Sequence, residues 1–144
     1  MADKIDPATR SRIMARVRSK NTGPELTLRR ALWAAGIRGW RCHVRDVPGT
    51  PDLCWKGRRV AVFVDSAWWH GHPSRWAPGR HPPAWDRKIL ANRQRDRDVN
   101  RALADAGWTV VRIWDFELIG ELPVVVNRVR AAIQSIGSPS RESL

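Results

Sequence analysis

Tyrosine is absent from this chain of 144 residues, and phenylalanine and cysteine occur only twice each, whereas tryptophan occurs nine times. The two cysteines, Cys42 and Cys54, form no Cys-x-x-Cys pair, which excludes a disulfide framework and a zinc finger. Both lie on expected strands, where we expect small buried residues. No segment approaches the roughly 18 consecutive apolar residues that a membrane helix needs, and the N-terminus lacks the apolar segment of a secretory signal. We therefore expect a soluble cytoplasmic protein.

Acidic residues are too few to balance the basic ones, since 26 Lys and Arg face 14 Asp and Glu, for a formal net charge of +12. The first two stretches of 50 residues carry 11 and 10 basic side chains against 4 and 5 acidic ones, whereas residues 101–144 carry 5 of each. This positive region predicts a polyanionic partner such as nucleic acid. The alternative is a merely solubilising surface. A membrane-surface helix is disfavoured because the charge spreads over several elements.

The chain length and the lack of an internal linker predict one domain over residues 1–144. Hydrophobic periodicity and capping signals, including the Thr22–Glu25 capping box, predict helices at 7–17, 22–36, 85–106 and 124–136. Alternating or continuous apolar runs predict strands at 40–45, 52–55, 59–65 and 108–114, and residues 137–144 are expected to form a frayed tail. This order favours an α/β or α+β fold with helices on a mixed sheet of about four strands.

Two aspartates bracket the expected hairpin between residues 52 and 65. If the hairpin is symmetric about Gly57, Asp52 faces roughly Val62, and Val64 lies diagonally across on the same face at about 7–8 Å. Strict alternation then turns Asp65 to the opposite face. Metal-dependent phosphodiester cleavage needs oxygen ligands near the phosphate. Two metal sites stay open: Asp52 with the Val64 backbone carbonyl, which we prefer, or Asp52 with Asp65 turned inward by a bulge. A simple turn is the alternative for an aspartate after proline.

A long loop with adjacent tryptophans follows this hairpin. Trp68 and Trp69 are neighbours in sequence, so a core can rarely bury both, and beside a basic surface they can stack on bases or wedge between them. His70 is close enough in sequence to reach a metal-held phosphate as a general base or acid. The alternatives are that the tryptophans cover a hydrophobic edge, or that His70, His72 and His81 hold zinc.

A polar stripe runs along the helix expected at 85–106, because Lys88, Asn92 and Asp96 are spaced by four residues. Asp96 adjoins the apolar positions Val99 and Leu103, and a partly buried carboxylate needs a partner. That partner could be a histidine, which the carboxylate would orient. The alternative is a surface helix with Arg–Asp pairs.

Together these segments resemble one family, the very short patch repair (Vsr) endonucleases, from about Asp6 to about Trp114. The matching pieces, in order, are Ala8-Thr9-Arg10-Ser11, Met14, Glu25, Pro48-Gly49-Thr50-Pro51-Asp52, Val62-Phe63-Val64-Asp65, Trp68-Trp69-His70-Gly71-His72, Trp85, Lys88-Ile89, Asn92, Arg95-Asp96-Arg97-Asp98, Gly107-Trp108 and Ile113-Trp114. The resemblance implies a restriction-endonuclease-like fold of the PD-(D/E)xK type, with a mixed central sheet flanked by helices. It also implies Mg²⁺-dependent nicking of one DNA strand, 5′ to the thymine of a T:G mismatch left by deamination of 5-methylcytosine.

By position, the resemblance implies that Asp52 is the metal-binding carboxylate and that His70 is the catalytic base. It implies that Asp65 and Glu25 support the active site and that Asp96 orients a histidine. The expected contacts with double-stranded DNA are Trp68, Trp69, Trp85, Lys88, Asn92, Arg93 and, in the N-terminal helix within residues 1–20, Met14. Mg²⁺ is the expected cofactor, with Mn²⁺ as an alternative.

The sequence departs from the family at the structural zinc that members often bind through three cysteines and a histidine. The matching positions here are Ala67, His72, Ser74 and Phe116, so we expect no structural zinc and expect Trp76 and nearby prolines to hold the loop. Ala67 also stands where the general motif has lysine, a role that the resemblance gives to His70. We expect a monomer at the bacterial nucleoid, with mismatch-repair proteins as candidate partners. A Vsr-like nuclease with a different DNA target and a catalytically inactive DNA-binding protein are the alternative functions.

Overall fold

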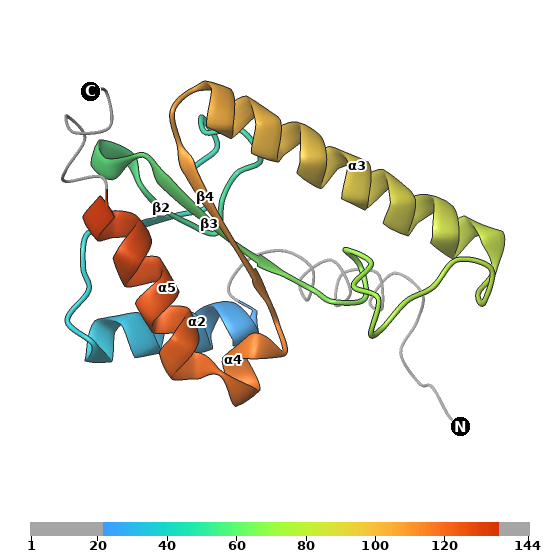
Figure 1. Ribbon diagram of the computed structural model, residues 1–144, viewed down its shortest axis with the longest axis horizontal. Helices are drawn as coiled ribbons and strands as arrows, with labels where there is room; N and C mark the ends of the chain where they lie inside the picture. Colours follow the sequence, from blue (N-terminus) through green and yellow to red (C-terminus); the bar gives the residue numbers. More distant parts are fainter. Residues whose placement is uncertain (1–21, 136–144) are drawn as a thin grey trace, which may run out of the picture.

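The computed structural model describes residues 22–135, which form a four-stranded mixed sheet flanked by helices. The strands lie in the order β1 (Arg41–Cys42), β2 (Leu53–Trp55), β3 (Val60–Asp65) and β4 (Thr109–Trp114). The first three are antiparallel neighbours, and β4 runs parallel to β3. Figure 1 shows α3 (Pro83–Asp105) on one side of the sheet, with α2 (Gly23–Ala34), α4 (Glu117–Gly120) and α5 (Leu122–Ser135) on the other. The predicted restriction-endonuclease-like architecture is confirmed. The helix expected at 7–17, Met14 and the tail at 137–144 lie outside the described residues.

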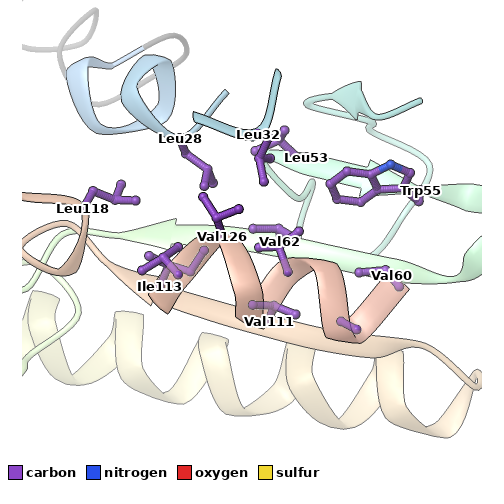
Figure 2. Packing of buried hydrophobic residues seen from close by; sticks show 13 residues of the cluster. Leu28, Leu32, Leu53, Trp55, Val60, Val62, Val111, Ile113, Leu118 and Val126 are labelled. Carbon is purple, nitrogen blue, oxygen red and sulfur yellow. The ribbon is translucent and has the colours of Figure 1, made fainter. Parts of the chain in front are cut away.

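Helices cover both faces of the sheet. Successive side chains of each strand point to opposite faces, so each strand contributes to both cores. One face packs on α2, α4 and α5 (Figure 2), through a core that includes Leu28, Leu32, Leu53, Val60, Val62, Val111, Ile113, Leu118 and Val125. The other face packs on α3, through Cys54, Ala61, Phe63 and Leu103, with Val99 beside them. The continuous apolar run of β3 is therefore a strand covered on both faces.

At one end of the interface between the sheet and α3, the side chains are polar instead of apolar. Asp65 follows Phe63 by two residues along β3, and Arg112 is the register partner of Phe63 on β4, so both lie on the face that packs against α3. Burying an apolar side chain contributes about 1.5–3 kcal/mol, and Leu103 and Phe63 supply such contacts at the other end of this interface. The apolar part of the interface thus fixes α3 where its polar stripe meets Asp65 and Arg112.

The capping box predicted at Thr22 begins α2. The Glu25 backbone N–H donates to Thr22 Oγ1 at 3.4 Å, and Gly36 takes a left-handed conformation just after the helix, with φ of 82°. The left-handed region of backbone conformation favours glycine, which has no Cβ. The cap places Glu25 in the first turn, where its side chain is only 3% exposed. A buried carboxylate at a helix start is a position that needs a partner.

Helix α3 is 23 residues long and begins two residues before the predicted start at 85. Its many charged residues agree with the finding that, across residues 22–135, no helix is both long and apolar enough to cross a bilayer. The short helix α4 was not predicted, since four residues are too few for a periodic pattern.

The first predicted strand is mostly wrong. Only Arg41 and Cys42 pair with the sheet, and His43 then takes a left-handed conformation with φ of 52°, which ends the strand. Cys42 is exposed rather than buried, whereas Cys54 is buried as expected. The physical reason is that β1 is a two-residue edge strand whose residues are both exposed, and Cys42 Sγ accepts a hydrogen bond from Arg29 Nη1 instead of entering the core.

The predicted register of the hairpin is wrong by one residue. The turn consists of the 3₁₀ segment Lys56–Arg58 followed by Arg59 in a left-handed conformation, so it is not symmetric about Gly57. Leu53, rather than Asp52, pairs with Val62. Extending the ladder by one residue places Asp52 opposite Phe63. A shift of one residue exchanges the faces of a strand, so Asp52 comes to the same side of the sheet as Asp65.

Candidate active site

A cavity of about 890 Å³ lies where the start of α2, the ends of β2 and β3, and the middle of α3 meet. Its lining includes all five residues that the sequence nominated as catalytic: Glu25, Asp52, Asp65, His70 and Asp96. They come from positions up to about 70 residues apart in the chain, and the fold brings them together. Lys88 and Asn92 of the predicted polar stripe line the same cavity.

Asp52 lines the cavity beside His43 and the backbone of Val64. Its Oδ2 accepts a hydrogen bond from the Val64 backbone N–H at 2.7 Å, and its Oδ1 lies 3.9 Å from His43 Nε2. Burial raises the pKa of Asp52 to about 6. The Val64 hydrogen bond opposes this rise and the charge of Glu25 adds to it. A carboxylate that is this costly to ionise in the folded protein is a group that a bound cation would stabilise.

The Val64 carbonyl points to the same edge of β3 as its N–H, because both groups of a residue in an antiparallel ladder face the same neighbour. Continuing the register of β2 and β3 places Pro51 opposite Val64. Proline has no N–H to donate, so the ladder supplies no donor for this carbonyl beside Asp52. The preferred metal site of the sequence, Asp52 with the Val64 carbonyl, is therefore geometrically available.

Glu25 has a histidine partner that the sequence did not nominate. His43 Nε2 lies 2.8 Å from Glu25 Oε2, and the left-handed backbone at His43 is what turns the ring toward α2. The alternation of Arg41, His43 and Arg45 signalled only that His43 is on a polar face. The contact with Glu25 joins residues 18 apart in sequence, and no local pattern predicts it.

Across the cavity, His70 pairs with Asp96, so the histidine partner that the sequence predicted for Asp96 is confirmed. His70 Nδ1 lies 2.5 Å from Asp96 Oδ2 and 3.8 Å from Asp65 Oδ1. Burial by itself would lower the pKa of His70, but the hydrogen bond to Asp96 and the charge of Asp65 outweigh it, and the pKa is raised. With Nδ1–H donating to Asp96, the ring carries its lone pair on Nε2, the tautomer that a general base needs.

Arg112 links the two carboxylates beside His70, and the sequence gave no sign of this role. Its Nη1 lies 3.1 and 3.3 Å from the two oxygens of Asp65 and 3.4 Å from Asp96 Oδ1, and its guanidinium sits 4.0 Å from the centre of the Phe63 ring. Burial raises the pKa of Asp65, while His70 and Arg112 oppose the rise. No bulge interrupts β3, since Asp65 pairs in regular register with Trp114. The bulged version of the metal site is therefore not what this sheet forms.

The tryptophans of the loop form one aromatic group. The rings of Trp69 and Trp85 stack with centroids 5.3 Å apart, and Trp68 packs edge-on against Trp69 at 6.4 Å. Lys88 Nζ lies 4.6 Å from the centre of the Trp69 ring, and Asn92 donates to the Trp69 carbonyl at 2.9 Å. Trp69 also lines the cavity. The group thus connects the cavity with Trp85, a large apolar side chain left 42% exposed.

Arg93, predicted to contact DNA, lies under the loop rather than in the cavity. Its guanidinium is 5.8 Å from the centre of the Trp76 ring, and a Cβ at Gly71 would meet its Cδ at 2.7 Å. Arg95, which was not nominated individually, lines the cavity instead. Arg93 and Arg95 have different surroundings because residues two apart on a helix do not share a face.

The loop is held by aromatic and polar contacts where the resemblance would place zinc ligands. The ring of His72 accepts a hydrogen bond at Nδ1 from the backbone N–H of Ser74 at 3.0 Å, and it packs edge-on against Phe116 with ring centroids 5.0 Å apart. The backbone N–H of His72 donates to the Ala67 carbonyl. Trp76 is buried, as predicted for a residue that holds the loop, and its Nε1–H donates to Asp86 at 3.0 Å. Within residues 22–135, the clusters that could hold a metal are Glu25–His43–Asp52 and Asp65–His70–Asp96.

Comparison with known proteins decides the family. Residues 2–76, more than half of the chain, match the model of the DNA mismatch endonuclease Vsr. The chain belongs to the Vsr family. A type II nicking enzyme of Xanthomonas oryzae pv. oryzae, V.XorIIP, is 43% identical over 132 residues, which cover 90% of this chain and 96% of that protein. A DNA mismatch endonuclease Vsr of Escherichia coli K12 is 33% identical over 123 residues, covering 83% and 78%.

Membership of the Vsr family makes this chain an endonuclease. V.NaeI of Lentzea aerocolonigenes, another type II nicking enzyme, is 40% identical over 118 residues, which cover 76% of this chain and 69% of that protein. The Vsr match and these nicking enzymes account for the basic charge that the sequence carries, since DNA is a polyanion.

Proposed function

We propose that the protein is a Mg²⁺-dependent nicking endonuclease that cuts one DNA strand 5′ to the thymine of a T:G mismatch. The observation that carries the proposal is that one cavity holds Asp52 and the His70–Asp96 pair and has Trp69 on its wall. A largely buried carboxylate, an oriented base and an aromatic side chain suit metal-dependent cleavage next to a mismatched base pair.

The proposed metal ligands are Asp52 and the Val64 carbonyl, with waters and phosphate oxygens in the remaining positions. Their chemistry fits Mg²⁺, which prefers oxygen and keeps several waters, and Mn²⁺ is the alternative ion. A bound ion polarises the scissile phosphate and neutralises charge developing on it. Asp65 is proposed as a support, because both its oxygens are engaged by Arg112.

His70 is the proposed general base. Its Nε2 takes a proton from the attacking water, while Asp96 accepts the Nδ1–H bond, fixes the ring and stabilises the imidazolium that forms. Because the pKa of His70 is raised, the fraction of unprotonated base increases with pH through and above the ordinary pKa of 6.5. The cutting rate is therefore expected to rise over that range.

Mismatch selection is assigned to the tryptophan group. The Trp69–Trp85 stack holds flat aromatic surfaces together next to the cavity, and such side chains can enter a base step and kink the duplex. A mismatched step is the easiest to open, because less pairing and stacking energy is lost there. Lys88, over the Trp69 ring, supplies positive charge for a phosphate at the same place.

The test is cleavage of end-labelled duplexes that differ only in a central T:G, T:A or other mismatched pair, with Mg²⁺, with Mn²⁺ and with EDTA. The expected result is a single nick 5′ of the thymine in the T:G duplex, lost with EDTA and in Asp52→Asn. The matched control is Asp105→Asn, an exposed aspartate at the end of α3.

Other outcomes identify the alternatives. Equal nicking of all duplexes would replace mismatch selection with a Vsr-like nuclease of different target. Tight binding of DNA without metal-dependent cutting of any duplex would indicate a catalytically inactive DNA-binding protein. Full activity of Asp52→Asn would refute the metal-ligand assignment.

A further inference from the structure

In the cluster formed by Glu25, His43 and Asp52, only Asp52 has a role in the reaction as described so far. We propose that it is a mixed nitrogen and oxygen metal site, preformed in the free protein, in which His43 Nε2 and Glu25 complete the coordination begun by Asp52. The inference rests on the proposed function, because Asp52 is common to both, and it adds an imidazole ligand that changes which cation the enzyme prefers.

The distances fit a single ion. His43 Nε2 lies 2.8 Å from Glu25 Oε2 and 3.9 Å from Asp52 Oδ1, and all three ligand atoms lie within 4.8 Å of one another. Octahedral ligands at about 2.1 Å from an ion are about 3 Å apart when adjacent and about 4 Å apart when opposite. The separations of 2.8 and 3.9 Å correspond to an adjacent pair and an opposite pair of ligand positions, with the His43 proton on Nδ1 so that Nε2 can bind.

The second cluster, Asp65–His70–Asp96, also has one histidine and two carboxylates, but it is a poor cation site. Arg112 Nη1 is within 3.4 Å of oxygens on both of its carboxylates. A guanidinium in that position supplies the positive charge that a metal would otherwise supply. The charged groups that act on the pKa of Asp52 are Glu25, His43 and Asp65, and no arginine or lysine is among them.

Rigid placement distinguishes this cluster from a chance grouping. Glu25 is fixed by the capped first turn of α2 and is 3% exposed. The His43 ring comes from a left-handed residue whose N–H donates to the Asp52 carbonyl at 3.3 Å, so the backbone ties two of the ligands together. Ligands held in advance lose little conformational freedom when the ion binds.

An imidazole ligand has a consequence for metal preference. Mg²⁺ favours an all-oxygen environment, whereas Mn²⁺ binds nitrogen donors more readily, and Zn²⁺ more so. The free protein is therefore expected to bind Mn²⁺ more tightly than Mg²⁺, by tenfold or more, and Zn²⁺ is expected to compete at the same site.

The experiment is a Mn²⁺ titration of the full-length, DNA-free protein, followed by the electron paramagnetic resonance signal of unbound Mn²⁺, with Mg²⁺ and Zn²⁺ as competitors. The variants are Asp52→Asn, His43→Gln and, as the matched control, His72→Gln, whose ring packs against Phe116 away from the cavity. Pulsed measurements on the bound Mn²⁺ report whether an imidazole nitrogen is a ligand, and thermal unfolding in EDTA reports any purely structural effect.

We expect a nitrogen signal in the wild type and in His72→Gln that is lost in His43→Gln, together with Mn²⁺ affinity reduced about tenfold and Mg²⁺ affinity reduced much less. Unchanged Mn²⁺ binding by His43→Gln, with binding lost in Asp52→Asn, would overturn the imidazole ligand and leave the proposed metal carboxylate intact. Unchanged binding by Asp52→Asn would instead refute the metal assignment of the proposed function. Absence of Mn²⁺ binding by the wild type would refute a preformed site.

Discussion

Replacing Asp52, the proposed metal ligand, with asparagine is expected to stabilise the metal-free protein, not weaken it. Burial raises the pKa of Asp52 from 3.8 to about 6, against the Val64 hydrogen bond, so ionising this group opposes folding. The folded-state pKa lies above the unfolded one. The associated stability is therefore fully present below about pH 4 and is lost as pH rises through 6. Asp52→Asn keeps an oxygen for the Val64 N–H but carries no charge.

The magnitude follows from the size of this rise. One pH unit of displacement corresponds to about 1.4 kcal/mol, so a rise from 3.8 to about 6 costs the wild type about 3 kcal/mol above pH 7. This is an upper limit, because a fifth of the Asp52 side chain is exposed and solvent screens its charge. The variant is thus expected to exceed the wild type by up to roughly 10 °C in melting temperature at pH 8, and to match it near pH 4.

The assay is thermal unfolding of both proteins in EDTA between pH 4 and pH 8, with Asp105→Asn as the control for an exposed aspartate. Adding Mn²⁺ at 100 times its dissociation constant should stabilise the wild type by about 2.7 kcal/mol and leave Asp52→Asn unchanged. A variant that is less stable than the wild type at pH 8 in EDTA, or a difference that does not depend on pH, would refute the reasoning.

Four other perturbations test neighbouring parts of the structure. Arg112→Met leaves the buried Asp65 carboxylate without its guanidinium and should cost about 2–3 kcal/mol in urea unfolding; adding Asp65→Asn should restore much of it, and additive losses would argue against the pair. Trp69→Ala should reduce discrimination between T:G and T:A duplexes in nicking rate by roughly tenfold or more, and unchanged discrimination would remove Trp69 from mismatch selection. Asp86→Ala removes the acceptor of two loop hydrogen bonds and should speed amide exchange across the loop; exchange as slow as in the wild type would mean that other contacts hold it. DNA affinity should fall steeply with salt, whereas a shallow slope would place the basic surface outside the footprint.

Much of the fold could be predicted because the signals are local. The capping box at Thr22 and the continuous apolar run of β3 depend on residues within one turn or one strand, and both appear as expected. The polar stripe of α3 follows from the helical period alone. Its burial against Leu103 was enough to require a partner for Asp96, which is His70.

The remaining contacts could not be predicted, because they depend on turns and register that join distant parts of the chain. His43 reaches Glu25 through one left-handed residue that is not glycine, a conformation that is uncommon and carries no periodic signal. In the sequence, Arg112 stands between the apolar residues of β4, a pattern that is typical of a solvent-facing position. It lies inside because α3 covers that face and supplies a carboxylate.

The turn of Lys56–Arg58 and Arg59, at the other end of the hairpin, controls the cavity although none of its residues lines it. Its length fixes which residue of β2 meets which residue of β3 and so keeps Asp52 beside Val64. Substitutions in this turn should be tolerated, including glycine at the left-handed Arg59, which suits that backbone. Losing or gaining a single residue there would move Asp52 to the wrong face of the sheet. The endonuclease can therefore change the chemistry of this turn freely during evolution, but it cannot change its length.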